Sequence, residues 1–308
     1  MFVTAFAPAT VANLNCGFDV LGLAIDAPGD EVTVMWNDIG KVRIVSIEGD
    51  GGKLSLDPQK NTATGGILTL LERVLSEPRG VDVVIKKKMP FGSGLGSSAA
   101  SAVAGVVAMN ALLGNPLTRT ELVEFALDGE VIASGSRHAD NVAPSLLGGI
   151  VLIRSYHPLS LIELPVPEGL YVTVIHPHIE ILTKEARDIL PKQVSMPDAI
   201  RQTGNIAAFT SALYKNDLTL LAESMVDVFA EPYRANLLPH FDEVKSAALA
   251  AGAISFGISG SGPSMFAFTN GEEAAYSVAQ SMRFALEKYS ITADTYTSPV
   301  NRKGAIVW

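Results

Sequence analysis

The chain has 308 residues, of which 48% are hydrophobic and 18% charged, a composition typical of a globular protein with a sizeable core and not of a disordered one. Its net charge is −9, and the longest run of like charges is Lys86, Lys87 and Lys88. Nucleic-acid binding requires a concentrated basic surface, which this sequence lacks. We therefore expect no nucleic-acid partner.

The single cysteine, Cys16, has no partner for an internal disulfide, which suits a reducing cytoplasm. We interpret it as a small buried side chain and not as a reactive thiol. The N-terminus lacks the basic segment of a signal peptide. Residues 89–118 carry no charge, but their five glycines and the prolines near both ends argue against a membrane span. A cytoplasmic protein without a membrane partner is expected.

In the first half, the hydrophobic pattern predicts strands and helices in alternation. Strands are expected over residues 2–7, 31–36, 41–47, 81–86 and 149–154, and helices over 66–75, over 97–113 and from 118 onward. The helix over 97–113 is apolar on nearly every side, so we expect it at the centre of a domain. Thr118 and Glu121 form a capping box that starts the next helix. The segment that contains Asp140 is interpreted as irregular.

The second half is expected to begin near residue 156. Its predicted elements are a strand over 171–176, helices over 183–190, 198–215 and 218–229, and then helix 242–251, strand 254–257, strand 265–269, helix 272–289 and strand 292–297. The β-α-β-β-α-β order is typical of a split βαβ sandwich. The predicted fold class is α+β with two domains, residues 1–155 and 156–308.

A glycine-rich loop, PFGSGLGSSAA, occupies residues 90–100 between a predicted strand and a predicted helix. Free N–H groups and the positive end of the helix dipole make this position attractive to an anion such as phosphate. Glycines at 92, 94 and 96 allow close approach and positive φ. Ser97 and Ser98 can bind phosphate, ligate a metal or cap the helix. The loop lacks the Gly-Lys-Ser/Thr end of a Walker A motif, and Ser97 stands where a dinucleotide motif has its third glycine.

Three segments, in order, resemble the motifs of the superfamily of galactokinases, homoserine kinases, mevalonate kinases and phosphomevalonate kinases (GHMP kinases). They are APATVANLNCGFDVLG at residues 7–22, the glycine-rich loop, and GISGSGPSMFAF at residues 257–268. Three further segments resemble homoserine kinases in particular: SRHADNVAPSLLGG (136–149), TKEARDILP (183–191) and EPYRANLLP (231–239). The resemblance covers essentially the whole chain.

The resemblance implies a fold, an activity and two substrates. The N-terminal domain would be a ribosomal-protein-S5-domain-2-like nucleotide-binding domain, and the C-terminal domain a ferredoxin-like split βαβ sandwich. The activity would be ATP-dependent phosphorylation of the side-chain hydroxyl of L-homoserine in threonine biosynthesis. Related enzymes are commonly dimers, so a homodimer is expected.

The resemblance also implies which residues hold ATP and its Mg²⁺ ion. ATP would contact Pro90, Phe91, Gly92, Ser93, Gly94, Leu95, Gly96, Ser97, Ser98, Ala99, Ala100 and Asn61, the last lying against adenine. Ser98 and Glu130 match the two metal ligands, although spacing alone favours a solvent-facing glutamate at 130. Lys87 and Lys88 could neutralise phosphates, but we interpret them as exposed lysines at a strand end.

The acceptor would be a zwitterion with a free hydroxyl. Arginine grips a carboxylate with paired donors, and an ammonium requires an acidic partner. Within the family-like segments, the candidates for this site are Asn13, Asp19, His138, Asn141, Thr183, Arg187 and Arg234. We assign the two arginines to the carboxylate and Asp19 to the ammonium. Each residue taken alone also has a structural explanation; Arg187, for example, could simply pair with a nearby acid.

The catalytic residues implied by the resemblance are Asn141, Glu130 and Ser98. Mevalonate-type kinases place a basic aspartate eleven positions after the metal-binding glutamate, and that count leads here to Asn141, which cannot act as a base. Asp140 precedes it, on a segment expected to be irregular and to point its side chain elsewhere. The interpretation is catalysis by positioning and charge neutralisation, without a strong base.

Alternative functions remain open at this point. A mevalonate- or sugar-type kinase of the same superfamily would act on a different alcohol, but the arginine pair and Asn141 argue against it. A non-catalytic nucleotide-binding regulator is a second alternative. A dinucleotide-dependent oxidoreductase is the weakest, because the third glycine of its motif is missing.

Overall fold

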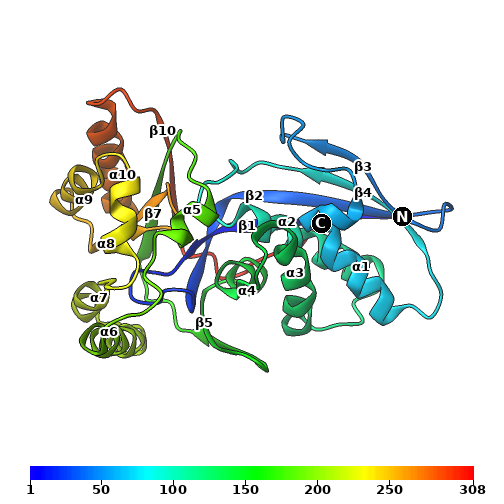
Figure 1. The fold of residues 1–308 in the computed structure, drawn as a ribbon, viewed down its shortest axis with the longest axis horizontal. Coiled ribbons are helices and arrows are strands. Elements are labelled where there is room, and N and C mark those ends of the chain that lie inside the picture. Colours follow the sequence, from blue (N-terminus) through cyan, green and yellow to red (C-terminus); the bar gives the residue numbers. More distant parts are fainter.

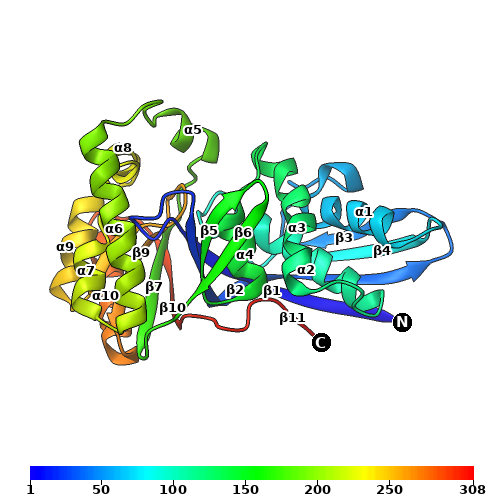
Figure 2. The same ribbon diagram turned by 90° about the horizontal axis from the view of Figure 1, so that it is seen from below.

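The computed structural model describes residues 1–308, except for the side chain of Ser134. The chain forms two halves side by side, each a β-sheet covered by helices (Figure 1). Figure 2 shows the same halves from below, with α1, α2 and α3 over one half and α6 and α7 over the other.

The first half is built on a seven-stranded sheet with the order β11-β1-β2-β4-β3, to which β5 and β6 are added beside β2. Its strands are β1 (Phe2–Ala12), β2 (Leu21–Asn37), β3 (Val42–Glu48), β4 (Gly80–Lys86), β5 (Ile150–Tyr156), β6 (Leu159–Leu164) and β11 (Ile306–Val307). β3 and β4 pair in parallel and the other neighbours are antiparallel. β2 pairs with β1 on one edge, and on its other edge it pairs with β5 near its start and with β4 near its end.

Four helices belong to this half: α1 (Thr62–Val74), α2 (Ser97–Leu112), α3 (Arg119–Ser134) and α4 (Ala139–Leu147), with a short 3-10 helix η1 (Pro58–Lys60) before α1. α2 packs against β1 and β2 on one side and against the other three helices elsewhere, which explains why its sequence is apolar all round. Its central position is confirmed. The capping box of Thr118 and Glu121 is also confirmed at the start of α3.

The second half contains a four-stranded antiparallel sheet with the order β10-β7-β9-β8. Its elements are β7 (Leu170–Pro177), α5 (Thr183–Asp188), α6 (Met196–Lys215), α7 (Leu218–Ser224), α8 (Glu231–Arg234), η2 (Ala235–Leu237), α9 (Phe241–Ala250), β8 (Ser255–Ile258), β9 (Met265–Asn270), α10 (Glu272–Glu287) and β10 (Ala293–Pro299). Residues of α9 and α10 form one apolar core with the sheet, and residues of α6 and α7 join a different core. The β7-α9-β8-β9-α10-β10 order confirms the predicted split βαβ arrangement.

Two expectations about local structure were wrong. Residues 139–147, expected to be irregular, form helix α4, which tolerates Pro144 in its interior. The helix expected over 218–229 ends at Ser224, because the Asp227 carboxylate accepts hydrogen bonds from the backbone N–H groups of Phe229, Ala230 and Glu231. A side chain that competes for backbone donors in this way favours a turn over a helix.

The chain passes between the two halves more than once. β6 still pairs with β5, so the first sheet extends to Leu164, beyond the boundary expected near residue 155. β11 returns from the C-terminal end to pair with β1. Among the residues described, none of the helices combines the length and hydrophobicity required of a membrane span.

Candidate active site

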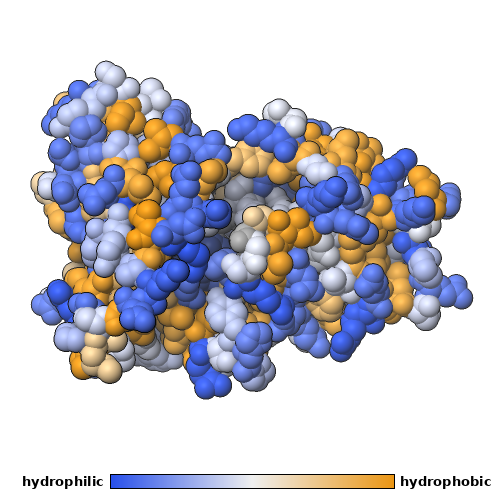
Figure 3. Space-filling model, in the orientation of Figure 1, coloured by the Kyte–Doolittle hydropathy of each residue, from blue (hydrophilic) through white to orange (hydrophobic). Residues whose placement is uncertain are grey.

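A cleft of about 300 Å³ lies between the two halves, and Figure 3 shows the hollow at the centre of this face. The first half lines it mainly with the glycine-rich loop, the start of α2 and the start of α4, and the second half with α5, α8 and the turn after β8. A pocket of this size, with charged groups converging on it, is the expected form of a small-molecule site.

The glycines of the loop are required by packing. Gly94 and Gly96 have positive φ, 74° and 68°, which favours glycine. A Cβ at Gly94 would lie 2.4 Å from the carbonyl oxygen of Ser259, and one at Gly96 would lie 2.2 Å from Thr10 Oγ1 and 2.8 Å from Asn141 Oδ1. The structure therefore adds a reason for these glycines besides the expected approach to phosphate.

The turn after β8 holds the loop in place from the other half of the molecule. Ser259 Oγ donates to the carbonyl oxygen of Gly94 at 2.7 Å, and the Ser264 N–H donates to that of Ser93 at 3.2 Å. This turn is the segment that resembles the third superfamily motif. The two glycine-rich segments, far apart in sequence, thus form one unit.

Lys87 is buried behind the loop, which corrects the expectation of an exposed lysine. Its Nζ donates to Asp30, to Ser97 Oγ (2.7 Å) and to Ser101 Oγ (2.8 Å). Burial lowers the pKa of Lys87, and the Asp30 carboxylate opposes that change. Lys88, in contrast, is exposed and pairs with Glu31.

The sequence did contain a signal for Lys87. Val81, Val83 and Ile85 face inward at alternate positions of β4, and Lys87 continues that spacing just beyond the strand. A lysine on the inward side of a strand requires a buried acid, which is Asp30 on β2. Sequence analysis missed Asp30, Ser101 and Thr10 as parts of the site.

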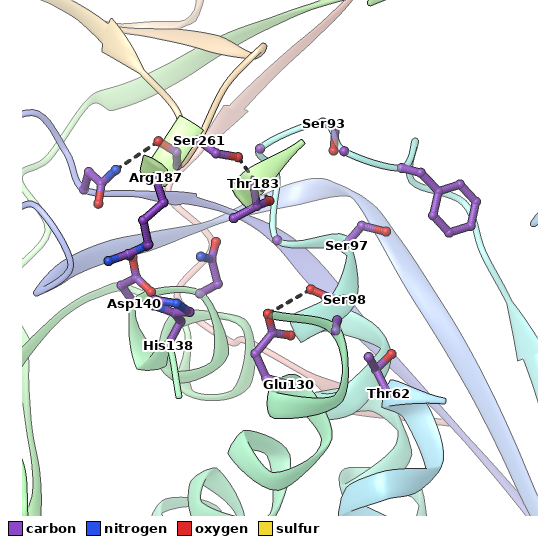
Figure 4. Close-up of a pocket in the computed structure, with 18 of the residues that line it drawn as sticks. Thr62, Ser93, Ser97, Ser98, Glu130, His138, Asp140, Thr183, Arg187 and Ser261 are labelled. Carbon is purple, nitrogen blue, oxygen red and sulfur yellow. Dashed lines mark hydrogen bonds between the residues drawn. The ribbon is translucent and has the colours of Figure 1, made fainter. Parts of the chain in front are cut away.

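Ser98 and Glu130 lie together, with Ser98 Oγ donating to Glu130 Oε1 at 3.0 Å (Figure 4). Glu130 is 7% exposed, so the solvent-facing interpretation suggested by spacing was wrong. Burial raises the pKa of Glu130 to about 7, while Ser98 opposes the rise. Two hard oxygen donors beside the cleft suit Mg²⁺. Within the described structure, no group of three or more His, Cys, Asp or Glu side chains is arranged to hold a metal ion.

The opposite end of the cleft contains the charged residues expected for the acceptor. Arg187 Nη2 lies 2.9 Å from both carboxylate oxygens of Asp19. Arg234 is buried, and its Nε and Nη1 donate to the carbonyl oxygens of Ala186 (2.9 Å) and Gly260 (2.8 Å). Arg187 is therefore paired with Asp19, the residue expected to bind the ammonium of the acceptor. Arg234 is instead fixed by hydrogen bonds to two backbone carbonyls.

The remaining acceptor candidates line the same part of the cleft. Asn13 Nδ2 donates to the Gly260 carbonyl at 3.0 Å, and Asn141 Oδ1 accepts from Thr10 Oγ1 at 2.7 Å. His138 lies at the start of α4 and Thr183 at the start of α5. All seven candidates line the cleft.

Two family models match this chain: the GHMP kinases N terminal domain over residues 61–149 and the GHMP kinases C terminal over residues 209–288. A homoserine kinase of Chlorobium phaeovibrioides is 49% identical, with 98% of each chain covered. The chain belongs to the homoserine kinases of the GHMP kinase family. It is therefore a kinase, a phosphotransferase.

Solved structures agree with this membership. The crystal structure of a homoserine kinase from Cytophaga hutchinsonii has a TM-score of 0.97 and 52% identity, covering 100% of this chain and 97% of that one. An L. major mevalonate kinase shares the fold, with a TM-score of 0.71 at 16% identity over 96% of this chain and 95% of that one.

Not every residue expected to bind ATP in this homoserine kinase lines the cleft. Of the residues described, Pro90, Leu95, Ala99, Ala100 and Asn61 lie outside its lining. The Asn61 amide caps α1 by accepting from the Ala63 N–H at 3.0 Å, and it donates to the Ser55 carbonyl at 3.0 Å. Its neighbour Thr62 lines the cleft instead, so contact between Asn61 and adenine stays a prediction.

Proposed function

We propose that this kinase transfers the γ-phosphoryl group of ATP to the side-chain hydroxyl of L-homoserine, giving O-phospho-L-homoserine for threonine biosynthesis. One observation carries the proposal: in a homoserine kinase fold, a glycine-rich loop that leads into a helix N-terminus and a pair of arginines line the same cleft. The loop suits the phosphates and the arginines suit an amino-acid carboxylate.

At the phosphate end, the loop and the N-terminus of α2 would bind the ATP phosphates through backbone N–H groups. Lys87 supports this role because it bonds to the Ser97 carbonyl at 2.9 Å and fixes the first turn of α2. Family membership implies a divalent metal, which we take to be Mg²⁺, held by Ser98 and Glu130. When bound, it would neutralise negative charge on the phosphates.

At the acceptor end, Arg187 and Arg234 would bind the carboxylate, and Asp19 with Asn13 would bind the ammonium. Arg187 and Asp19 form an ion pair with each other. The incoming acceptor would join or replace this pair, with its carboxylate on Arg187 and its ammonium on Asp19. His138, Asn141 and Thr183 would surround the rest of the acceptor. A mevalonate or a sugar lacks the ammonium that Asp19 would recognise.

The test is ATP turnover, followed by ADP release, with L-homoserine, mevalonate, galactose and L-serine as acceptors. Turnover with L-homoserine at least tenfold above the other three is expected. ADP release that no acceptor stimulates would instead favour a nucleotide-binding regulator, and preference for mevalonate or galactose would favour the other superfamily activities.

We further propose that residues 1–155, together with strands β6 and β11 of the same sheet, act as the nucleotide-binding domain and the rest of 156–308 as the C-terminal domain, and that the enzyme is a cytoplasmic homodimer. Sedimentation of the purified chain at micromolar concentration tests the dimer. A single species of 32.5 kDa would contradict it.

A further inference from the structure

We propose that Phe18 is a further positioning residue for the acceptor, whose ring holds the guanidinium groups of Arg187 and Arg234 in place for the acceptor carboxylate. This inference rests on the proposed function and deepens it, because it names a residue that would decide how tightly a carboxylate-bearing acceptor is bound. Phe18 would act through the two arginines and not by touching either substrate.

Phe18 lies in the turn between β1 and β2, where its side chain is half-buried. Among the residues described, it belongs to neither of the two apolar cores. It is also not one of the described residues that line the cleft. An aromatic side chain normally contributes its large apolar area to a core. A half-buried phenylalanine outside both cores therefore needs another explanation.

The ring of Phe18 lies beside the two arginines of the acceptor end. Its centroid is 5.7 Å from the Arg187 Cζ atom and 5.3 Å from the Arg234 Cζ atom. Both distances are within the range of about 6 Å over which an aromatic ring attracts a cation, and arginine is the more frequent partner. Arg187 comes from α5 and Arg234 from α8, so one ring of the first half joins two elements of the second.

Two neighbouring guanidinium groups require such support, because their charges repel each other. Burial lowers the pKa of Arg234, Asp19 opposes that change, and the positive charge of Arg187 adds to it. Asp19 pairs with Arg187, but in the proposed complex it would bind the ammonium of the acceptor. The ring would then remain beside both arginines. Side chains that are already oriented lose less conformational entropy when they bind a carboxylate.

The turn that carries Phe18 is fixed by hydrogen bonds of its backbone. The Asp19 N–H donates to Asn13 Oδ1 at 3.0 Å, and the Tyr156 hydroxyl donates to the Asp19 carbonyl oxygen at 3.3 Å. The Gly17 N–H donates to the Asn13 carbonyl oxygen at 2.9 Å. Asp19 has a φ of 59°, an uncommon conformation that persists where surrounding contacts maintain it. Phe18 is therefore placed between two residues whose backbone is held.

The experiment compares the steady-state kinetics of wild type, Phe18→Leu and Phe18→Tyr with L-homoserine and ATP. Leucine is apolar but has no ring, so KM for homoserine should rise about tenfold, as expected for the loss of two contacts between a cation and a ring. Both kcat and KM for ATP should stay within about twofold, because a contact made equally in the ground and transition states moves KM alone. Phe18→Tyr keeps the ring and should restore KM.

Phe284→Leu is the matched control. Phe284 is 61% exposed on α10, and Lys288 Nζ lies 5.0 Å from the centroid of its ring. The same substitution therefore removes the same kind of contact, on a helix that supplies none of the described residues of the cleft lining. KM for homoserine should be unchanged in this variant.

A second acceptor separates an action through the arginines from a general change of the site. 3-Aminopropan-1-ol has the hydroxyl and the amine of homoserine but lacks its carboxylate. Phe18→Leu should lower kcat/KM about tenfold with L-homoserine and no more than about twofold with 3-aminopropan-1-ol, since the arginines then have no carboxylate to bind.

A double-mutant cycle with Arg187→Lys gives the same information from L-homoserine alone. If the ring acts through Arg187, the rise in KM of the double variant should be smaller than the product of the two single effects. Effects that multiply exactly would overturn the inference.

Three further results would also overturn it: equal losses with both acceptors, a raised KM for ATP, or an unchanged KM for homoserine in folded Phe18→Leu. If a thermal melt shows that Phe18→Leu does not fold, trifluorination of the Phe18 ring alone decides the question. It retains the shape and weakens the negative face of the ring, so KM for homoserine should rise about threefold, and an unchanged KM would overturn the inference. Wild-type enzyme that does not turn over L-homoserine at all would instead overturn the proposed function, and this inference with it.

Discussion

The two ends of the cleft are built in opposite ways. At the phosphate end, Lys87 is buried with Asp30 and Ser101, and every one of these groups is bonded to another within the first half. At the acceptor end, Asp19 comes from the first half and Arg187 from the second, and both are partly exposed. The Lys87 cluster at the phosphate end is complete without a ligand, whereas the Asp19–Arg187 pair at the acceptor end is an ion pair that a ligand must rearrange.

The difference reflects what each end would bind. Phosphates are the same in every catalytic cycle, so a preformed arrangement of N–H groups avoids reorganisation during the reaction. An amino-acid acceptor carries two opposite charges, and a pre-existing ion pair keeps both partners neutralised until it arrives. Substitutions in the buried Lys87–Asp30 pair should therefore mainly affect stability, and substitutions in the partly exposed Asp19–Arg187 pair should mainly affect substrate affinity.

The largest effect is expected for Lys87→Met. It leaves Asp30 buried without its cation, and breaking a buried pair typically costs about 3–5 kcal/mol of unfolding free energy. Lys88→Met is a matched control, since Lys88 pairs with Glu31 at the surface and should contribute no more than about 1 kcal/mol. Urea unfolding measures both. Equal losses would mean that the buried Lys87–Asp30 pair contributes no more to stability than the surface pair.

Glu130→Gln should lower kcat by about a hundredfold, because an amide replaces the anionic ligand proposed for the metal. The fold should be retained, since the substitution removes a charge that burial disfavours. Glu273→Gln, at the exposed start of α10, is the control. Activity is measured over a range of Mg²⁺ concentrations. A variant as active as wild type at limiting Mg²⁺ would contradict the assignment.

The two arginines should respond differently to replacement by lysine. Arg187→Lys should raise KM for homoserine by roughly 10- to 100-fold, corresponding to the ~1.5–3 kcal/mol of a charged hydrogen bond, without lowering the melting temperature. Arg234→Lys should raise KM and also lower the melting temperature, because it leaves the buried carbonyls of Ala186 and Gly260 short of donors. Steady-state kinetics with thermal melts separate the two.

An effect on KM for ATP, with KM for homoserine unchanged, would place these arginines at the phosphates instead. A lower melting temperature without any kinetic change would make both purely structural.

The smallest effect is expected for Thr10→Val, which keeps the shape of the side chain but removes the hydrogen bond to Asn141. A lost hydrogen bond of about 1 kcal/mol corresponds to a reduction in kcat of about fivefold. Thr10→Ser retains the hydroxyl and should restore kcat, whereas a role in packing alone would not be rescued in this way. Unchanged kcat in Thr10→Val would show that Asn141 is oriented by other contacts.

Local patterns in the sequence predicted much of the fold. The apolar residues of 97–113 identified the central helix, and Thr118 with Glu121 marked the start of α3. These predictions succeeded because the relevant contacts lie within a few residues along the chain. The end of α7 was missed because the carboxylate of Asp227 takes backbone N–H groups that a longer helix would have used.

The site could be predicted as a set of residues but not as a geometry. The resemblance to GHMP kinases brought together candidates that do line one cleft, yet it could not reveal the bond between Thr10 and Asn141, 131 positions apart, or that between Asp19 and Arg187, 168 positions apart. Such contacts depend on how whole sheets and helices pack. Asp140 was expected to point its side chain elsewhere, but it lines the cleft. That placement depends on helix α4, which was not predicted from the sequence.

The hydrogen bond from Ser259 to the Gly94 carbonyl makes a segment in the first half of the sequence depend on one in the second half. The nucleotide loop of one half has no room for a Cβ at Gly94 because the other half occupies that space. Recombination between related kinases would have to exchange both segments together, since a foreign turn of different shape would displace the loop. The two halves are therefore expected to have been inherited as a single unit, even though each has a sheet and a core of its own.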